Sequence, residues 1–194
     1  MHDELAGSGF TIVAVAFDDD PAVVRPLAEG ITFPVLIDRE HLLSELYAIT
    51  NVPTVLWIDE DDRIARPNGV AFGTDMFADF TGVDSEIHKE AVRRWVSTGE
   101  VDLADDEARA AVVPLSAVAL EARLEFRMAA FLRRDDRAEA AAAHFARAVE
   151  LAPHDFTIRR AAMPLQGTDP FGEEFFAMYE QWQAAGAPYN GLPA

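Results

Sequence analysis

The chain contains no cysteine among its 194 residues. Disulfide exchange and thiol-based peroxide reduction both need a cysteine thiolate, so this polypeptide alone can catalyse neither reaction. It also has no apolar run near the roughly 20 residues that span a bilayer. The N-terminal residues MHDELAGSGF have neither the basic segment nor the apolar segment of a secretory signal. We therefore expect a cytoplasmic protein with no membrane partner.

Basic residues are scarce as well. Lys89 is the single lysine beside 15 arginines, and 34 acidic residues bring the net charge to −18. Such a surface repels phosphate backbones, so no nucleic acid partner is expected. The histidines lack the spacing of a zinc or iron site, and neither a nucleophile elbow nor a phosphate-binding loop occurs. We therefore nominate no catalytic residue, no metal ligand and no cofactor.

The first half of the chain alternates apolar strands with short helices. The segments TIVAVAF at 11–17 and FPVLID at 33–38 are rich in β-branched residues and predict strands. Asp20 followed by Pro21 predicts a helix start, because the carboxylate can cap the helix and proline suits its first position. Another helix is predicted at 39–49, with one apolar face made of Leu42, Leu43, Leu46 and Ile49.

The segment ITNVPTVLWIDEDDRI at 49–64 predicts a hairpin that is entered through a proline. Its strands are expected at Val55–Ile58 and at 63–72, the second interrupted at 67–69 by Pro-Asn-Gly. A helix that is capped by Asp84 or Ser85 and ends near Gly99 should follow. Its inward residues are predicted to be Ile87, Ala91 and Trp95.

This order of elements resembles the thioredoxin-like superfamily, and in particular the alkyl hydroperoxide reductase and thiol-specific antioxidant group together with the thioredoxin-like proteins of cytochrome maturation. The resemblance covers residues 1–98, which we take as one domain. The matching segments are GFTIVAVAFDD, FPVLID and NVPTVLWIDEDDRI. It implies a cis peptide bond between Val52 and Pro53. It also implies that the loop made of Asn51, Val52, Pro53 and Thr54 presents its backbone to a bound peptide.

The chain departs from this family in one respect. The family has a further strand and a Cys-x-x-Cys helix before the segment that matches 11–17, and this strand lies between the strands matching 11–17 and 55–58. A central strand buries several apolar side chains at about 1.5–3 kcal/mol each, so its loss costs on the order of 10 kcal/mol, comparable with a domain's whole stability. Three compensations are possible: the flanking strands pair directly, a second copy covers the edges, or the missing segment lies upstream of Met1. Since open edges invite pairing, we expect a homodimer.

The second half is predicted to be helical, with a linker at 99–114 and a helical module at 115–194. One helix carries the apolar stripe Ala117, Leu120, Leu124, Met128 and Phe131, and it forms a helical hairpin with the next. The second helix resembles part of one degenerate tetratricopeptide repeat, with matching residues Ala141, Phe145, Ala148 and Pro153. A third helix is expected at 156–165. A fourth, opened by Asp169 and Pro170, carries an aromatic stripe that is either a peptide groove or, as we expect, core packed on the bare sheet face.

The predicted fold class is therefore α/β, with an incomplete thioredoxin-like mixed sheet and flanking helices, followed by an all-α helical-hairpin module. Two functions remain open. In the first, a redox-inactive thioredoxin-like protein acts by protein or peptide binding or by assembly through the loop at 51–54. In the second, the chain is a fragment of a thiol–disulfide oxidoreductase or peroxidase whose catalytic cysteines lie upstream of Met1.

Overall fold

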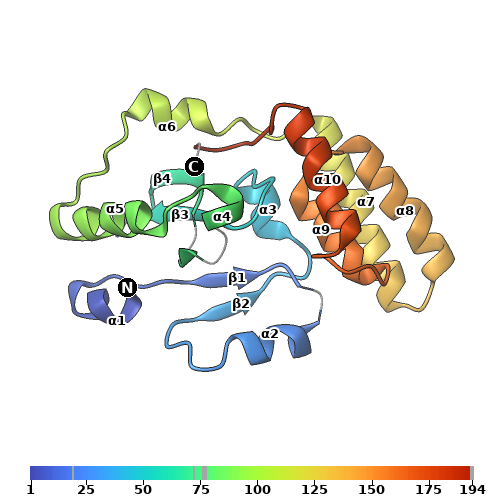
Figure 1. The fold of residues 1–194 in the computed structure, drawn as a ribbon, viewed down its shortest axis with the longest axis horizontal. Helices are drawn as coiled ribbons and strands as arrows, with labels where there is room; N and C mark the ends of the chain where they lie inside the picture. The colour runs from blue at the N-terminus through green and yellow to red at the C-terminus, as the bar shows by residue number, and fades with distance from the viewer. Residues whose placement is uncertain (19, 72, 76–77, 193–194) are drawn as a thin grey trace.

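The computed structural model describes residues 1–18, 20–71, 73–75 and 78–192. The fold is mixed α/β, with strands in the first half of the chain and helices throughout (Figure 1). Its elements are α1 His2–Leu5, the 3-10 helix η1 Ala6–Ser8, β1 Ala14–Ala16, α2 Pro21–Leu27, β2 Val35–Ile37, α3 Leu42–Leu46, β3 Thr54–Ile58, β4 Ile64–Val70, α4 Ala78–Thr81, α5 Ser85–Thr98, α6 Asp105–Ala111, α7 Ala117–Arg134, α8 Ala138–Leu151, α9 Phe156–Leu165 and α10 Glu173–Ala184. None of the helices in these ranges is both long and apolar enough to cross a membrane.

The strands form two separate sheets of two strands each. β1 pairs in parallel with β2, while β3 and β4 form the predicted antiparallel hairpin. In the described part of the chain no ladder joins the two sheets. Figure 1 shows β1 and β3 as the inner strands, with β2 and β4 outside them. Direct pairing of the two flanking strands, one of the three compensations considered, is therefore not what this fold uses.

The hairpin differs from its prediction in one detail. β4 continues through Pro67 and Gly69 without a break, and the irregularity predicted at 67–69 takes the form of a bulge: the step from Gly69 to Arg66 on β4 lies opposite the shorter step from Val55 to Trp57 on β3, so β4 carries the extra residue. A bulge lets the ladder absorb a residue that cannot donate a hydrogen bond. The expected end of this strand at Phe72 lies outside the described residues.

Helix α5 follows its local signals. The Asp84 carboxylate accepts a hydrogen bond from the Glu86 N–H at 2.8 Å, and Gly99 ends the helix at φ +74°. Trp95 of this helix stacks on Trp57 of β3, with ring centroids 5.0 Å apart. α5 therefore covers one face of the hairpin. Ile87, however, was predicted to face inward and is 70% exposed.

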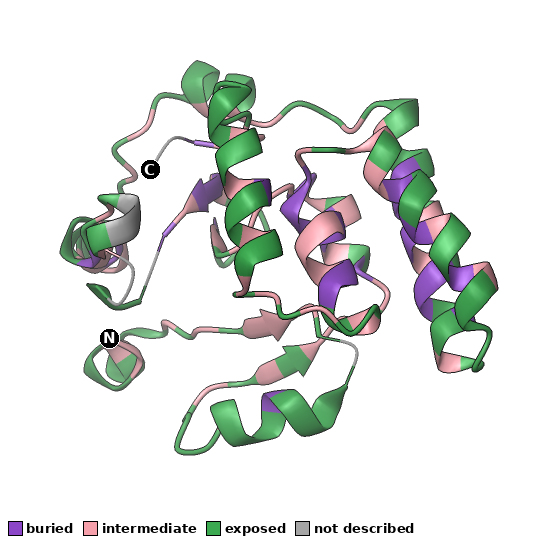
Figure 2. Cartoon of the chain, turned by 45° about the vertical axis from the view of Figure 1, so that its right-hand side comes forward, coloured by how far each residue is buried: buried purple, intermediate pink, exposed green. Residues whose placement is uncertain are grey.

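The helical half has its own core between α7, α8 and α9, where buried residues gather in Figure 2. The cluster consists of Ala122, Phe126, Ala129, Leu132, Ala141, Phe145, Ala148, Ile158 and Ala162. The aromatic stripe of α10 is core, but its partner is not a sheet face: Phe175, Tyr179 and Trp182 pack against Phe156 of α9. α10 begins at Glu173, after the predicted start at 169–170.

Arginines of α7 hold the helical half against the segment that contains α3. The Arg127 guanidinium donates to the Glu40 carbonyl oxygen at 2.6 Å and pairs with the Glu45 carboxylate at 2.7 Å. Arg134 pairs with the Glu40 side chain at 2.8 Å. Because α3 meets α7 through these polar groups, its predicted apolar face is only partly used. Leu42 and Leu46 are 53% and 76% exposed.

His41 is the aromatic part of this junction. Its ring lies between those of Phe17 and Phe126, with centroid distances of 4.9 and 4.6 Å, and its Nε2 lies 3.0 Å from the Phe17 carbonyl oxygen. Burial lowers the pKa of His41 and Arg127 adds to this effect, while the Phe17 and Thr157 backbone and Asp38 oppose it. The folded protein therefore binds this proton less readily than the unfolded chain.

We expect acid to destabilise the protein through this residue. The free energy of unfolding should be unaffected by His41 well above the ordinary pKa of about 6.5 and should fall below it, by at most about 1.4 kcal/mol per pH unit. His41→Asn, which tolerates the left-handed φ of +53°, should flatten that slope in urea titrations between about pH 6.5 and 5.5. Burial also lowers the pKa of His88, so His88→Asn should remove part of the pH dependence that is left in His41→Asn. An unchanged slope in His41→Asn would contradict the assignment.

Candidate functional site

The loop at Asn51–Thr54 leads into β3, and its Val52–Pro53 peptide bond is cis, as expected. Two local hydrogen bonds shape the loop: the Val52 N–H donates to Asn51 Oδ1 at 2.8 Å, and Thr54 Oγ1 donates to the Asn51 carbonyl oxygen at 2.7 Å. In the described residues the Val52 carbonyl oxygen accepts no hydrogen bond. Among the described residues, the loop therefore leaves the Val52 carbonyl oxygen unpaired, while the Val52 N–H is held by the Asn51 side chain.

A buried ion pair between Arg123 and Asp155 fixes the backbone just before this loop. Arg123 of α7 is 2% exposed, pairs with Asp155 at 2.9 Å and donates to the Ile49 carbonyl oxygen at 2.7 Å. Asp155 is the N-cap of α9. Its carboxylate accepts hydrogen bonds from the N–H and from Oγ1 of Thr157. Burial raises the pKa of Asp155, against the opposing effect of Arg123 and Thr157. The first turn of α9 is further fixed by a bond from the Phe156 N–H to the Thr50 carbonyl oxygen at 2.9 Å.

The C-terminal segment closes the loop from the other side. Thr54 gives its own proton to Asn51, so its Oγ1 accepts from the Tyr189 hydroxyl at 3.3 Å. Burial raises the pKa of Tyr189. Three residues after Tyr189, the Leu192 N–H donates to the Asn68 carbonyl oxygen at 2.6 Å, so the segment follows the outer edge of β4. This contact could not be predicted from the sequence, because nothing local to residues 187–192 points to the loop.

Among the residues that the structure describes, no hydrogen bond occupies the inner edges of the two sheets. The Ala14 N–H donates to the Pro34 carbonyl oxygen at 2.9 Å, and the Ala16 carbonyl oxygen accepts from the Asp38 N–H at 2.8 Å. Since successive residues of a strand direct their backbone groups to opposite edges, the N–H and C=O of Val15 point away from β2. Directly after β3, the Asp59 N–H donates to the Arg63 carbonyl oxygen across the hairpin. By the same alternation, the backbone groups of the preceding residue, Ile58, point to the inner edge.

Apolar side chains accompany these open edges. Val13, just before β1, is 52% exposed, and Ile58 at the end of β3 is 46% exposed. Unpaired backbone groups beside exposed β-branched residues make a strand edge a template for another strand. The structure therefore brings the predicted loop and two free strand edges into one region.

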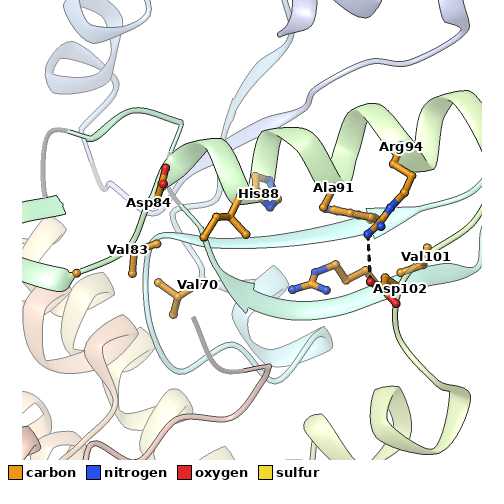
Figure 3. Close-up of a pocket in the computed structure, with 12 residues that line it drawn as sticks. Val70, Val83, Asp84, His88, Ala91, Arg94, Val101 and Asp102 are labelled. Carbon is orange, nitrogen blue, oxygen red and sulfur yellow. Dashed lines mark hydrogen bonds and ion pairs between the residues drawn. The ribbon is translucent and has the colours of Figure 1, made fainter.

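A pocket of about 380 Å³ lies between the hairpin and α5 (Figure 3). Its residues are Trp57, Arg66 and Val70 from the hairpin, Gly82, Val83, Asp84, Ile87, His88, Ala91 and Arg94 from α5 and the loop before it, and Val101 and Asp102 from the segment after α5. Arg94 and Asp102 form an ion pair of 3.3 Å at its exposed rim. Sequence reasoning did not find this pocket, because its residues come from three separate segments and carry no motif.

One side of α7 exposes large apolar side chains. The stripe predicted on α7 does not pack on α8: Leu124, Met128 and Phe131 are 61%, 47% and 55% exposed. The opposite side of the helix, with Phe126, forms the core instead. We use the name α3–α7 patch for the exposed apolar side chains of the two helices that Arg127 and Glu45 join: Leu42, Leu46, Leu120, Leu124, Met128 and Phe131.

Comparisons with models of protein families, with curated proteins and with solved structures find no match to this chain. Function is therefore inferred from the chain's own contacts. In the described residues, no group of three or more histidine, aspartate or glutamate side chains is placed to hold a metal ion. The features that bear on function are the loop with its open edges, the pocket under α5 and the α3–α7 patch.

Proposed function

We propose that this chain is a redox-inactive, thioredoxin-like protein that binds an extended polypeptide segment along the open edges of β1 and β3. The observation that carries the proposal is that, among the described residues, no hydrogen bond pairs the facing edges of the inner strands of the two sheets. An added strand would satisfy the outward backbone groups of Val15 and would contact Val13 and Ile58. Strand addition of this kind draws its affinity from main-chain hydrogen bonds.

The loop at 51–54 fits the same occupant. It enters β3 at the end where the Val52 carbonyl oxygen has no partner among the described residues and can accept from a peptide N–H. The chain's net charge of −18 favours a basic segment over an acidic one. The ligand class is therefore an extended, β-branched peptide with positive charge.

Val15→Pro tests this function. The proline removes an N–H that points away from β2, so the hydrogen bonds of Ala14 and Ala16 to β2 are kept. The probe is a fluorescein-labelled peptide KTVTVTVK, followed by fluorescence anisotropy. We expect the wild-type chain to bind it and Val15→Pro to raise the Kd by at least about tenfold, which corresponds to roughly 1.4 kcal/mol.

The control ligand is the same peptide N-methylated at alternate residues, which cannot complete a hydrogen-bonded ladder. The wild-type chain should bind it at least as weakly as Val15→Pro binds the unmethylated peptide. Unfolding in urea checks that Val15→Pro keeps the fold. Equal binding of the probe by both proteins, or equal binding of the methylated peptide, would overturn the proposal. Absence of wild-type binding at about 1 mM peptide would do so too, since several main-chain hydrogen bonds added along a strand should give a Kd below this concentration.

The same unpaired edges favour a second candidate function. A strand and a Cys-x-x-Cys helix from a longer form of this polypeptide would fill the position between β1 and β3 and would make the protein a thiol–disulfide oxidoreductase or peroxidase. An in-frame Trp-Cys-x-x-Cys segment upstream of Met1, and insulin reduction by the longer product but not by its Cys→Ser variant, would support this function. An in-frame stop codon directly before Met1 would exclude it.

Assembly through the α3–α7 patch is the remaining part of the proposed function. Exposed apolar side chains grouped on one helix face mark interaction surfaces. The charges next to this patch are paired with each other, Arg127 with Glu45 and Arg134 with Glu40. Two copies of a chain with net charge −18 therefore meet with less repulsion here than across an unpaired acidic surface. The proposed occupant is a second copy in a two-fold homodimer.

A further inference from the structure

Arg66 is a half-buried cation without an acidic partner. Its guanidinium lies over the ring of Trp57, 5.4 Å from the ring centroid. Within the described residues it makes no ion pair and no hydrogen bond, in a chain with 34 acidic residues. Burial lowers the pKa of Arg66, yet an arginine stays protonated at neutral pH. A half-buried charge without a partner is costly, so this position favours an anion.

The pocket in which Arg66 lies has the size and walls of a small-molecule site. Its volume of about 380 Å³ lies within the range of roughly 300–1,000 Å³ found for ligand pockets. The walls include apolar residues from both sides, Val70 of the hairpin and Val83 and Ala91 above it (Figure 3). Trp57 is 5% exposed, and its indole N–H has no acceptor among the described residues. The pocket thus combines an unpaired cation, a spare donor and apolar surface.

The other ionisable groups around the pocket determine whether it favours a monoanion or a dianion. Burial, and then the charge of Arg66, lower the pKa of His88, so this imidazole is neutral at pH 7. Arg94 and Asp102 offset each other at the rim, and the Asp84 carboxylate also lines the pocket. A dianion such as phosphate would meet Asp84 with only one unpaired cation opposite it. A monoanion is matched by Arg66 alone, and the planar guanidinium suits a carboxylate.

We infer that this pocket is a binding site for a small organic carboxylate with an apolar body, held by the Arg66 guanidinium and seated against Trp57. The carboxylate neutralises Arg66, and the apolar body fills the space between Val70, Val83 and Ala91. The site lies on the face of the hairpin that α5 covers. It does not depend on strand binding at the β1 and β3 edges.

The test uses the full chain and 3-phenylpropionate as the probe, titrated by calorimetry at pH 7. From its size we expect a Kd on the order of 1 mM. Arg66→Gln should weaken binding at least about tenfold, whereas the matched variant Arg63→Gln, which removes an exposed arginine of the same hairpin that does not line the pocket, should change it less than about threefold. The neutral analogue 3-phenylpropanol and inorganic phosphate should each bind at least about tenfold more weakly than the carboxylate.

A second readout does not require a variant. The His88 imidazole titrates under the influence of Arg66, so saturation with 3-phenylpropionate should raise its pKa, as followed by its ring-proton NMR signals. Equal affinity of the wild type and Arg66→Gln, an unshifted His88 titration, or phosphate binding as tightly as the carboxylate would each overturn the inference. None of these outcomes affects the peptide-binding proposal, whose probe and variant lie elsewhere.

Discussion

Replacing Asp155 by asparagine is expected to lower the free energy of unfolding by about 3–5 kcal/mol, because it leaves the Arg123 guanidinium buried without its counter-charge. The Asp155 side chain is 6% exposed and the Arg123 side chain 2%. Asparagine caps a helix as well as aspartate does, so the bond from the Thr157 N–H at the start of α9 can be kept. The variant therefore isolates the charge. Urea unfolding followed by circular dichroism measures the change.

The matched control is Arg147→Gln, which breaks exposed ion pairs to Glu121 and Glu150 on the same helical half. It should leave the unfolding midpoint unchanged within error, because exposed pairs contribute little. The double variant Arg123→Met, Asp155→Leu should recover part of the loss, since no charge is then left buried. A midpoint shift in Asp155→Asn no larger than that of the control would contradict the assignment.

The elements that the sequence predicted well are those with local signals. The Asp20 carboxylate caps α2 and Asp84 caps α5, and both bonds join residues two positions apart. The hairpin likewise follows from two apolar segments with an acidic turn between them. Capped helices and hairpins of this kind need no knowledge of the rest of the fold. The cis bond before Pro53 is different, because it was expected from the family resemblance and not from local chemistry.

Faces of helices were predicted less well, and α7 shows why. Its large apolar side chains Leu124, Met128 and Phe131 predicted the packing face, whereas the buried face carries small residues such as Ala122 and Ala129. Close approach of two helices favours small side chains at the contact, and hydrophobicity ranks these below leucine or phenylalanine. The partner of α7 had to be known before its inner face could be identified.

The candidate sites divide in the same way. The loop at 51–54 was nominated from the family resemblance, which a run of consecutive residues carries. Arg123, which bonds to Ile49 just before the loop, and Tyr189, which bonds to Thr54, lie far away in sequence, and an arginine on a helix is usually expected to be exposed. Arg66 likewise belongs to no sequence motif. Only the position of α5 over the hairpin shows that it is half-buried beside Trp57.

Phe145→Ala is expected to destabilise the protein by about 3–5 kcal/mol, because it opens a cavity in a close-packed core. The Phe145 side chain is 1% exposed and its ring packs edge-on against that of Phe126. The matched variant Phe131→Ala lies on the helix paired with α8 but is 55% exposed, so the free energy of unfolding of the monomer should change by less than about 0.5 kcal/mol.

Sedimentation velocity then separates core from interface. If two copies meet through the α3–α7 patch, Phe131→Glu should shift the protein towards monomer, because a buried carboxylate without a partner opposes association. Val118→Glu, at a similarly exposed position of α7 outside the patch, should leave the distribution unchanged. A wild-type chain that sediments only as a monomer, or a Phe131→Glu variant that dimerises like the wild type, would leave the patch without a role in assembly. Because Phe145 lies on the covered side of this helix pair, a loss of stability confined to Phe145→Ala would confirm which face of α7 is the core.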